Sequence, residues 1–95
     1  MSDVPEVTND PAASRFEIRT DQGLAQLVYK QRGADLDLIH TEVPPLLEGR
    51  GYAAALATAA LGFARREGMK VIPTCPYVTT FLQRHPQYAD LVAHR

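Results

Sequence analysis

Three things are scarce in this sequence: cysteine, an excess of charge of either sign, and long hydrophobic runs. A single cysteine in 95 residues excludes an intramolecular disulfide and fits a reducing compartment. Ten lysines and arginines against eleven aspartates and glutamates give a net charge of −1, which excludes the basic surplus typical of nucleic-acid-binding proteins. The longest apolar-rich run, around residues 52–64, is too short to span a bilayer. We therefore expect a cytoplasmic protein without a nucleic-acid or membrane partner.

The chain is long enough for one domain with a core of modest size. Residues 1–13 lack hydrophobic periodicity and have no apolar core of the signal-peptide type. We predict a flexible N-terminal arm over residues 1–13 and a single domain over residues 14–95.

Hydrophobic alternation predicts three strands at the start of the domain, over residues 14–20, 24–32 and 34–43. The short connections between them favour antiparallel hairpins. In the third strand, Leu36 and Leu38 share one face. Asp35 and Asp37 share the other, which we expect to be solvated.

A long helix is predicted after Gly51, because apolar residues recur at helical spacing, at Tyr52, Leu56, Ala60 and Phe63. A short buried strand follows over residues 69–74, and the strand–helix–strand order implies that the two strands are parallel. Pro76 then begins a short helix that Pro86 ends, with a further turn or helix after it. The predicted fold class is α+β: a mixed, mainly antiparallel four-stranded sheet with one long crossover helix and short C-terminal helices.

The long helix begins with glycine where a capping side chain is expected. Ser, Thr, Asp or Asn usually accepts hydrogen bonds from the first N–H groups of a helix, but this chain has Gly49, Arg50 and Gly51. Exposed N–H groups without nearby side chains form an anion site suited to a phosphate. The alternative is a loop that only turns the chain. A Walker loop is excluded because no Lys-Ser/Thr pair follows, and the match to a dinucleotide fingerprint is weak because no acidic residue ends the next strand.

The stretch HTEVPPLLEGRGYAAALATAALGFARREGMKVIPTCPYV resembles small, single-domain members of the GNAT acetyltransferase superfamily. Three blocks carry the resemblance in order: HTEVP, then RGY-A before the helix, then PTCPY after it. The resemblance covers residues 14–90 and implies a truncated GNAT-like domain. It implies acetyl-CoA as co-substrate and acetyl transfer to an amine.

The resemblance also implies which residues hold coenzyme A. Val43 is expected beside the pantetheine arm, and the pyrophosphate is expected in a cradle made by Gly49, Arg50, Gly51, Tyr52 and Ala53. Two features depart from the family pattern. Glu48 stands where the loop usually has Gln or Arg, and the chain lacks the early helices and late hairpin that usually complete the acceptor pocket.

His40 is the first of three candidate catalytic residues. It follows Leu36 and Leu38 in alternation, so we predict that it projects from the helix-covered face. There it would face Cys75 across the cleft and take the proton from an attacking amine. The alternative is a structural histidine inside the sheet.

Cys75 and Tyr77 are the other two candidates. Cys75 precedes Pro76, which places it at a helix N-terminus where the dipole favours a thiolate that could carry the acetyl group. Tyr77 is a candidate general acid for the leaving thiolate. The alternatives are a small buried hydrophobe for Cys75 and a packing role for Tyr77.

No metal site is predicted, because His40, Cys75, His85 and His94 lack ligand spacing. The predicted function is acetyl-CoA-dependent N-acetyl transfer to an unidentified amine. The alternative is a non-catalytic or partner-dependent coenzyme A-binding or interaction module. The expected partners are a small-molecule or peptide amine and a second copy of the chain in a homodimer.

Overall fold

The computed structural model describes residues 6–93, which form one mixed sheet with helices. The elements follow one another as β1 (Thr8–Asp10), β2 (Arg15–Thr20), β3 (Gly23–Arg32), β4 (Asp35–Glu42), the 3-10 helix η1 (Pro45–Leu47), α1 (Tyr52–Arg66), β5 (Lys70–Ile72), α2 (Pro76–Arg84) and the 3-10 helix η2 (Pro86–Leu91). The sheet order is β1-β2-β3-β4-β5, with every pair antiparallel except β4 and β5. The predicted α+β fold is confirmed, and the sheet has five strands rather than four.

The additional strand is β1, which lies in the segment where we predicted a flexible arm. It pairs antiparallel with β2, and Thr8 stands opposite Glu17. The Tyr29 hydroxyl donates a 2.7 Å hydrogen bond to Asn9 Oδ1, and Val7 packs against the core. Three polar residues in a row show no alternation, which is why the sequence pattern did not reveal this strand. Residues 1–5 of the predicted arm lie outside the described residues.

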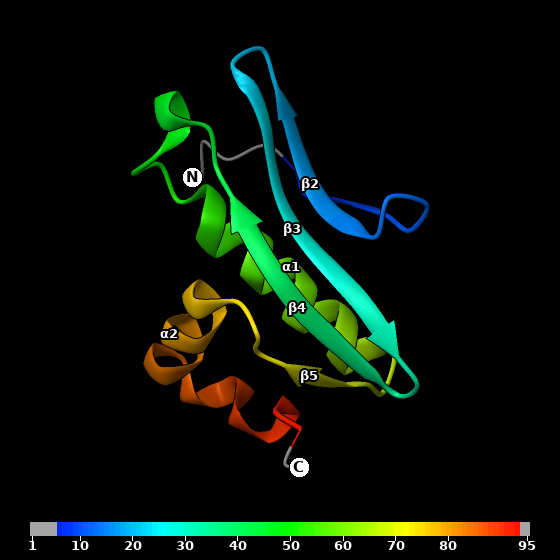
Figure 1. Ribbon diagram of the computed structural model, residues 1–95. Helices are drawn as coiled ribbons and strands as arrows, with labels where there is room; N and C mark the ends of the chain where they lie inside the picture. Colours follow the sequence, from blue (N-terminus) through cyan, green and yellow to red (C-terminus); the bar gives the residue numbers. More distant parts are fainter. Residues whose placement is uncertain (1–5, 94–95) are drawn as a thin grey trace.

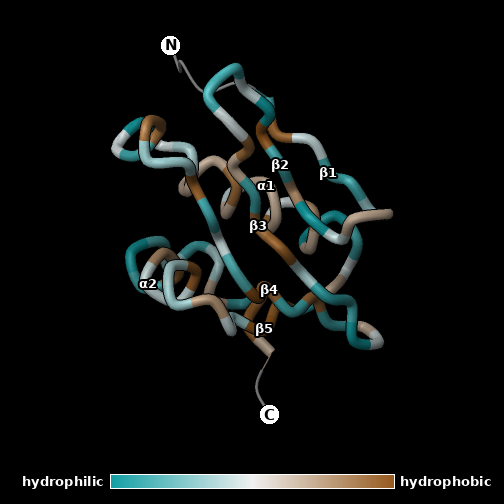
Figure 2. Tube along the Cα trace, turned by 45° about the horizontal axis from the view of Figure 1, so that its top comes forward, coloured by the Kyte–Doolittle hydropathy of each residue, from teal (hydrophilic) through white to brown (hydrophobic). Residues whose placement is uncertain are grey.

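The core lies between α1 and the face of the sheet that α1 covers (Figure 1). The buried side of α1 consists of Tyr52, Leu56, Ala57, Ala60, Leu61 and Ala64. The buried strand residues that complete this core include Ile18, Leu27, Leu36 and Leu38. Burial of each leucine contributes about 1.5–3 kcal/mol. Figure 2 shows the resulting alternation of hydrophobic and hydrophilic residues along the strands. None of the helices within residues 6–93 combines the length and apolar character needed to cross a membrane.

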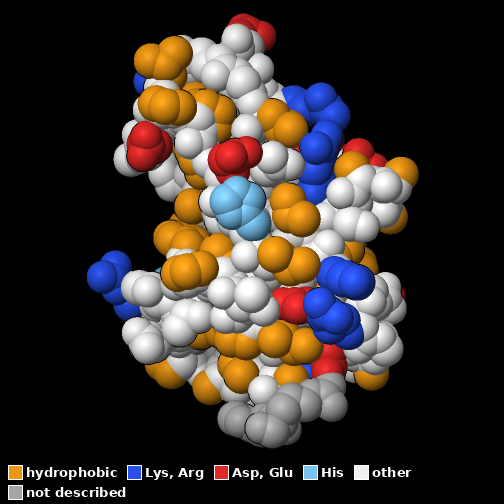
Figure 3. Space-filling model, viewed as in Figure 1, with side chains coloured by type: hydrophobic (Ala, Val, Ile, Leu, Met, Phe, Trp, Pro, Cys, Tyr) orange, Lys and Arg blue, Asp and Glu red, His pale blue; other side chains and the backbone are white. Residues whose placement is uncertain are grey.

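The opposite face of the sheet is polar, and charged side chains are scattered over it among hydrophobic ones (Figure 3). Asp35 and Asp37 are 4% and 6% exposed, so the solvated positions that we predicted for them are wrong. Arg32 Nε lies 2.9 Å from Asp37 Oδ2, and the Thr74 hydroxyl donates to the other carboxylate oxygen of Asp37. These two partners come from β3 and from the turn after β5, and they replace the water that Asp37 loses.

A β-bulge interrupts the alternation in β4. Tyr29 stands opposite Leu38 and Val28 stands opposite His40, so Ile39 is an extra residue without a partner on β3. An extra residue shifts every later side chain of the strand to the other face. The last β4–β5 pair, Asp37 with Ile72, comes just before the bulge. The two strands separate from that point onward.

Candidate functional site

An open cavity of about 560 Å³ lies at the end of β4. It is bounded by the η1 loop and by the N-terminal ends of α1 and α2, and its lining consists of Thr41, Glu42, Val43, Leu47, Glu48, Gly49, Gly51, Tyr52, Ala53, Ala54 and Tyr77. Five of the six predicted coenzyme A residues are among them. The sixth, Arg50, is exposed and does not line the cavity.

The start of α1 forms one wall of this cavity. Gly49 and Gly51 have φ angles of 79° and 84°, in the left-handed region that side chains disfavour. No side chain caps the helix, and its N-cap residue is Gly51. The first intrahelical bond runs from Ala55 N to Gly51 O, so the amides of the three residues before Ala55 have no acceptor inside the helix. This end of the helix is suited to bind an anion.

The chain brings Thr41, and not His40, to Cys75. Thr41 Oγ1 lies 3.2 Å from Cys75 Sγ. Cys75 is the N-cap residue of α2, as predicted, but it is 3% exposed and does not line the cavity. Thr41 and Tyr77 do line it. Cys75 is therefore a buried neighbour of a residue that lines the cavity, and its part in the chemistry stays a prediction.

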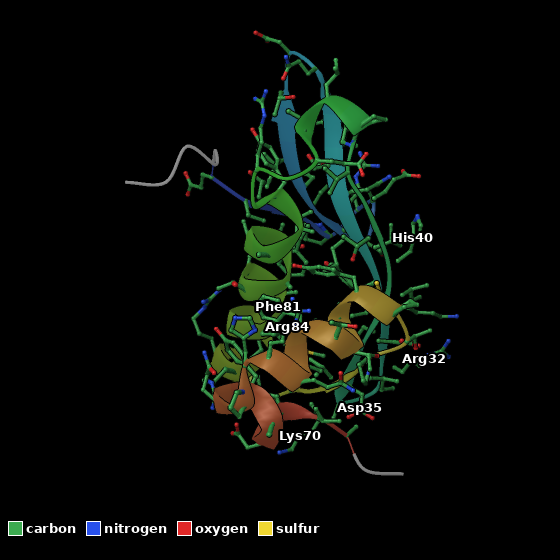
Figure 4. All side chains as sticks on the ribbon, turned by 90° about the vertical axis from the view of Figure 1, so that its left-hand side faces the viewer. Arg32, Asp35, His40, Lys70, Phe81 and Arg84 are labelled. Atoms are coloured by element: carbon green, nitrogen blue, oxygen red, sulfur yellow. The ribbon has the colours of Figure 1, made fainter. Side chains whose placement is uncertain are left out.

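His40 lies on the face of the sheet opposite α1, and Figure 4 shows its side chain projecting away from that helix. The side chain is 58% exposed, and its Nε2 atom lies 3.7 Å from Glu42 Oε2. The predicted orientation toward Cys75 is wrong, and the bulge at Ile39 is the reason. Had the strand alternated regularly through Ile39, with no bulge, His40 would lie on the helix-covered face with Leu36 and Leu38.

Tyr77 lines the cavity from the first turn of α2. Burial raises the pKa of its phenol above the ordinary value, and the positive charge of Arg84 opposes this shift only in part. The phenol is therefore protonated at neutral pH. In this state it can donate a hydrogen bond to a group in the cavity, although the raised pKa makes it a weaker acid than an ordinary tyrosine.

Thr41, Glu42, Leu47 and Ala54 also line the cavity and were not predicted from the sequence as site residues. The two polar ones are Thr41 and Glu42. Both belong to the HTEVP block, so the block itself was the available signal. The Glu42 carboxylate accepts a 2.9 Å hydrogen bond from Gln26 Nε2 and lies beside His40. Glu42 therefore connects the rim of the cavity with the polar face of the sheet.

Within residues 6–93, no three His, Cys, Asp or Glu side chains gather into a group that could hold a metal ion. His94, which we considered as a ligand, lies outside the described residues.

Comparisons with known proteins show which family this chain resembles in sequence and in fold. The family model of the GCN5-related N-acetyl-transferases matches residues 15–91. Protein NATD1 of Danio rerio is 38% identical over 93 residues, which cover 93% of this chain and 84% of that protein. Protein NATD1 of Mus musculus is 37% identical over 89 residues, which cover 88% of this chain and 81% of that protein. The solution NMR structure of a GCN5-like protein from Staphylococcus aureus has a TM-score of 0.74 and 26% sequence identity, and the match covers 100% of this chain and 93% of that one.

Proposed function

Because the chain belongs to the GCN5-related N-acetyltransferase family, we propose that it transfers an acetyl group from acetyl-CoA to an amine. The observation that carries the proposal is the uncapped, glycine-lined start of α1 in the wall of a cavity. The diphosphate of coenzyme A would lie against the amides of Tyr52, Ala53 and Ala54. The pantetheine arm would run along Val43, and exposed Arg50 would add a positive charge near the phosphates.

The acceptor amine would approach the thioester from the polar face of the sheet. Glu42 is at the rim of the cavity and its carboxylate lies beside His40 on that face. His40 would take the proton of the attacking amine, and Glu42 would stabilise the imidazolium that forms. The amine nitrogen bonds to the thioester carbon and the carbon–sulfur bond breaks. The coenzyme A thiolate then receives a proton from Tyr77.

An assay of acetyl-CoA against a panel of amines, peptides and polyamines tests this function. We expect at least one acceptor to gain an acetyl group while coenzyme A thiol is released in equal amount. Coenzyme A binding without product from any amine would contradict the enzyme assignment. It would favour the second candidate, a coenzyme A-binding module, for which the openness of the cavity between β4 and α2 is the supporting observation.

Replacing Glu48 with Gln should tighten acetyl-CoA binding several-fold. Glu48 lines the cavity at the loop that would hold the diphosphate, and its negative charge opposes phosphate binding there. Titration calorimetry at low and high salt measures the change, which should shrink as salt rises. Glu67→Gln, at the exposed far end of α1, is the matched control and should leave the affinity unchanged. Equal affinities for wild type and Glu48→Gln would mean that the diphosphate does not approach Glu48.

Replacing Tyr77 with Phe should lower kcat roughly tenfold and leave the acetyl-CoA affinity almost unchanged. This loss lies below the usual range for a general acid, because a thiol with a pKa of about 8.5 is a good leaving group as its thiolate and needs little protonation. Steady-state kinetics separate the two parameters. Tyr88→Phe removes a hydroxyl that does not line the cavity, so its kcat should stay at the wild-type value. A loss of affinity with unchanged kcat would assign Tyr77 to binding alone.

A further inference from the structure

A row of hydrogen-bonded side chains crosses the polar face of the sheet from β2 to β4. Glu17, Gln26 and Glu42 stand opposite one another in register on β2, β3 and β4. The Gln26 amide donates a 2.9 Å hydrogen bond from Nε2 to Glu42 Oε1. The other carboxylate oxygen of Glu42, Oε2, lies 3.7 Å from His40 Nε2. Gln26 and His40 therefore share one carboxylate, each on a different oxygen.

Arg15 determines which end of the Gln26 amide faces Glu42. Arg15 Nη1 lies 3.3 Å from Gln26 Oε1, and a guanidinium group can only donate hydrogen bonds. The amide oxygen therefore faces Arg15, and the NH2 group faces the carboxylate. A flipped amide would place donor against donor on one side and acceptor against acceptor on the other, so the two charged neighbours select one orientation.

A buried carboxylate holds Arg15 in turn. Glu17 is 5% exposed, and the proposed reaction makes no use of it. Arg15 Nε lies 2.7 Å from Glu17 Oε2, and Arg19 Nε lies 2.9 Å from Glu17 Oε1, so each oxygen has a guanidinium partner. Charge-assisted bonds of this kind are short and directional. Arg15 is thus fixed through its Nε atom, and its Nη1 atom remains for Gln26.

We propose that Gln26 is a positioning residue for the proposed general base, and that Arg15 and Glu17 hold it in place. Because Gln26 occupies Oε1 of Glu42, it keeps Oε2 toward His40, where the imidazolium forms as the amine loses its proton. The Glu42 side chain is 61% exposed, so without Gln26 it can turn into the solvent and leave the imidazolium without its charged neighbour. This inference rests on the proposed function, in which His40 takes that proton.

Gln26→Glu tests the role, because it removes the donor to Glu42 and keeps the size of the side chain. The substituted carboxylate can still accept from Arg15, so the fold should persist, but it has no N–H group for Glu42 and repels its charge. We expect kcat to fall about five- to tenfold, the effect of losing one hydrogen bond to a charged group. The affinity for acetyl-CoA should not change, because Gln26 does not line the cavity.

Gln31→Glu is the matched control on the same strand. Gln31 is exposed, and its Nε2 atom lies 3.5 Å from the backbone oxygen of Gly33 rather than beside Glu42. This variant should keep the wild-type kcat. Gln26→Leu removes the donor without adding a charge, so it should lower kcat to a similar extent and replaces Gln26→Glu if that variant does not fold.

A double-mutant cycle separates positioning from a general effect on the sheet. If Gln26 acts through Glu42, then Glu42→Ala alone and Glu42→Ala combined with Gln26→Glu should have the same kcat. A further five- to tenfold loss in the combined variant would overturn the inference. A folded Gln26→Glu variant with the kcat of wild type would overturn it as well.

NMR signals of the Gln26 side-chain amide test the hydrogen bond without any substrate. A proton donated to a carboxylate resonates downfield, so one Gln26 amide proton should lie downfield of both amide protons of Gln31. It should move upfield in Glu42→Ala, and in part in Arg15→Leu, where the amide can flip. A protein with this signal that acetylates no amine would contradict the proposed function while the position of Gln26 remained supported. An active protein whose Gln26 signal does not respond to Glu42→Ala would contradict the inference alone.

Discussion

Replacing Gly51 with valine should weaken acetyl-CoA binding by about 10- to 100-fold. Gly51 has a φ of 84°, where a β-branched residue costs about 1–3 kcal/mol. We expect the backbone to release this strain by turning the first amides of α1 away from the cavity, and a cost of 1.4 kcal/mol corresponds to a tenfold loss of affinity. Titration calorimetry with acetyl-CoA measures the loss.

Gly68→Val provides the matched control for the strain itself. Gly68 lies just beyond the other end of α1 and has a φ of 67°, so valine is strained there as well. Both variants should lose stability, but Gly68→Val should bind acetyl-CoA with wild-type affinity. If Gly51→Val bound equally well, the start of α1 would not be the anion site.

Replacing His40 with alanine should lower kcat by about 10²–10⁴, the usual cost of a lost general base. The affinity for acetyl-CoA should not change, because His40 does not line the cavity. The melting temperature should also change little, because the side chain is 58% exposed. Turnover, calorimetry and thermal unfolding on the same preparation separate these three quantities.

Lys30→Ala is the control for the face on which His40 lies. Lys30 is exposed on the same polar face, and it should keep wild-type turnover. Glu42→Gln should lower kcat in the same direction as His40→Ala, because it removes the charge that stabilises the imidazolium. A large drop in the melting temperature of His40→Ala, with turnover retained, would identify a structural histidine instead.

Much of the fold could be predicted because its main elements carry strong local signals. Alternating apolar residues marked β2, β3 and β4, and Pro76 marked the start of α2. The strand β1 carried no such signal, because its partners Tyr29 and Glu17 lie elsewhere in the chain. The burial of Asp37 could not be predicted either, since its ion pair with Arg32 and its bond from Thr74 exist only once the strands pair.

The candidate site also has a part that the sequence predicts and a part that it does not. The role of the glycines before α1 could be predicted from the sequence, because it depends only on residues next to one another in the chain. The helix has no capping side chain, and Gly49 and Gly51 adopt the positive φ angles that glycine favours. The orientation of His40 could not be predicted, because a bulge leaves no mark in a pattern of apolar residues. The same bulge at Ile39 places Thr41, and not His40, beside Cys75.

The bulge has a consequence for how β4 tolerates change over evolution. A bulged strand bends, and this bend follows directly on the last pair with β5, where the chain opens toward the cavity. Exchange of Ile39 for another residue leaves the number of residues, and thus the bend, intact. Deletion of Ile39 would keep His40 and Thr41 on their present faces, because regular alternation then gives the same result, but it would straighten the strand beside the opening. We therefore expect evolution to conserve the number of residues in β4 at this position more strictly than the identity of residue 39.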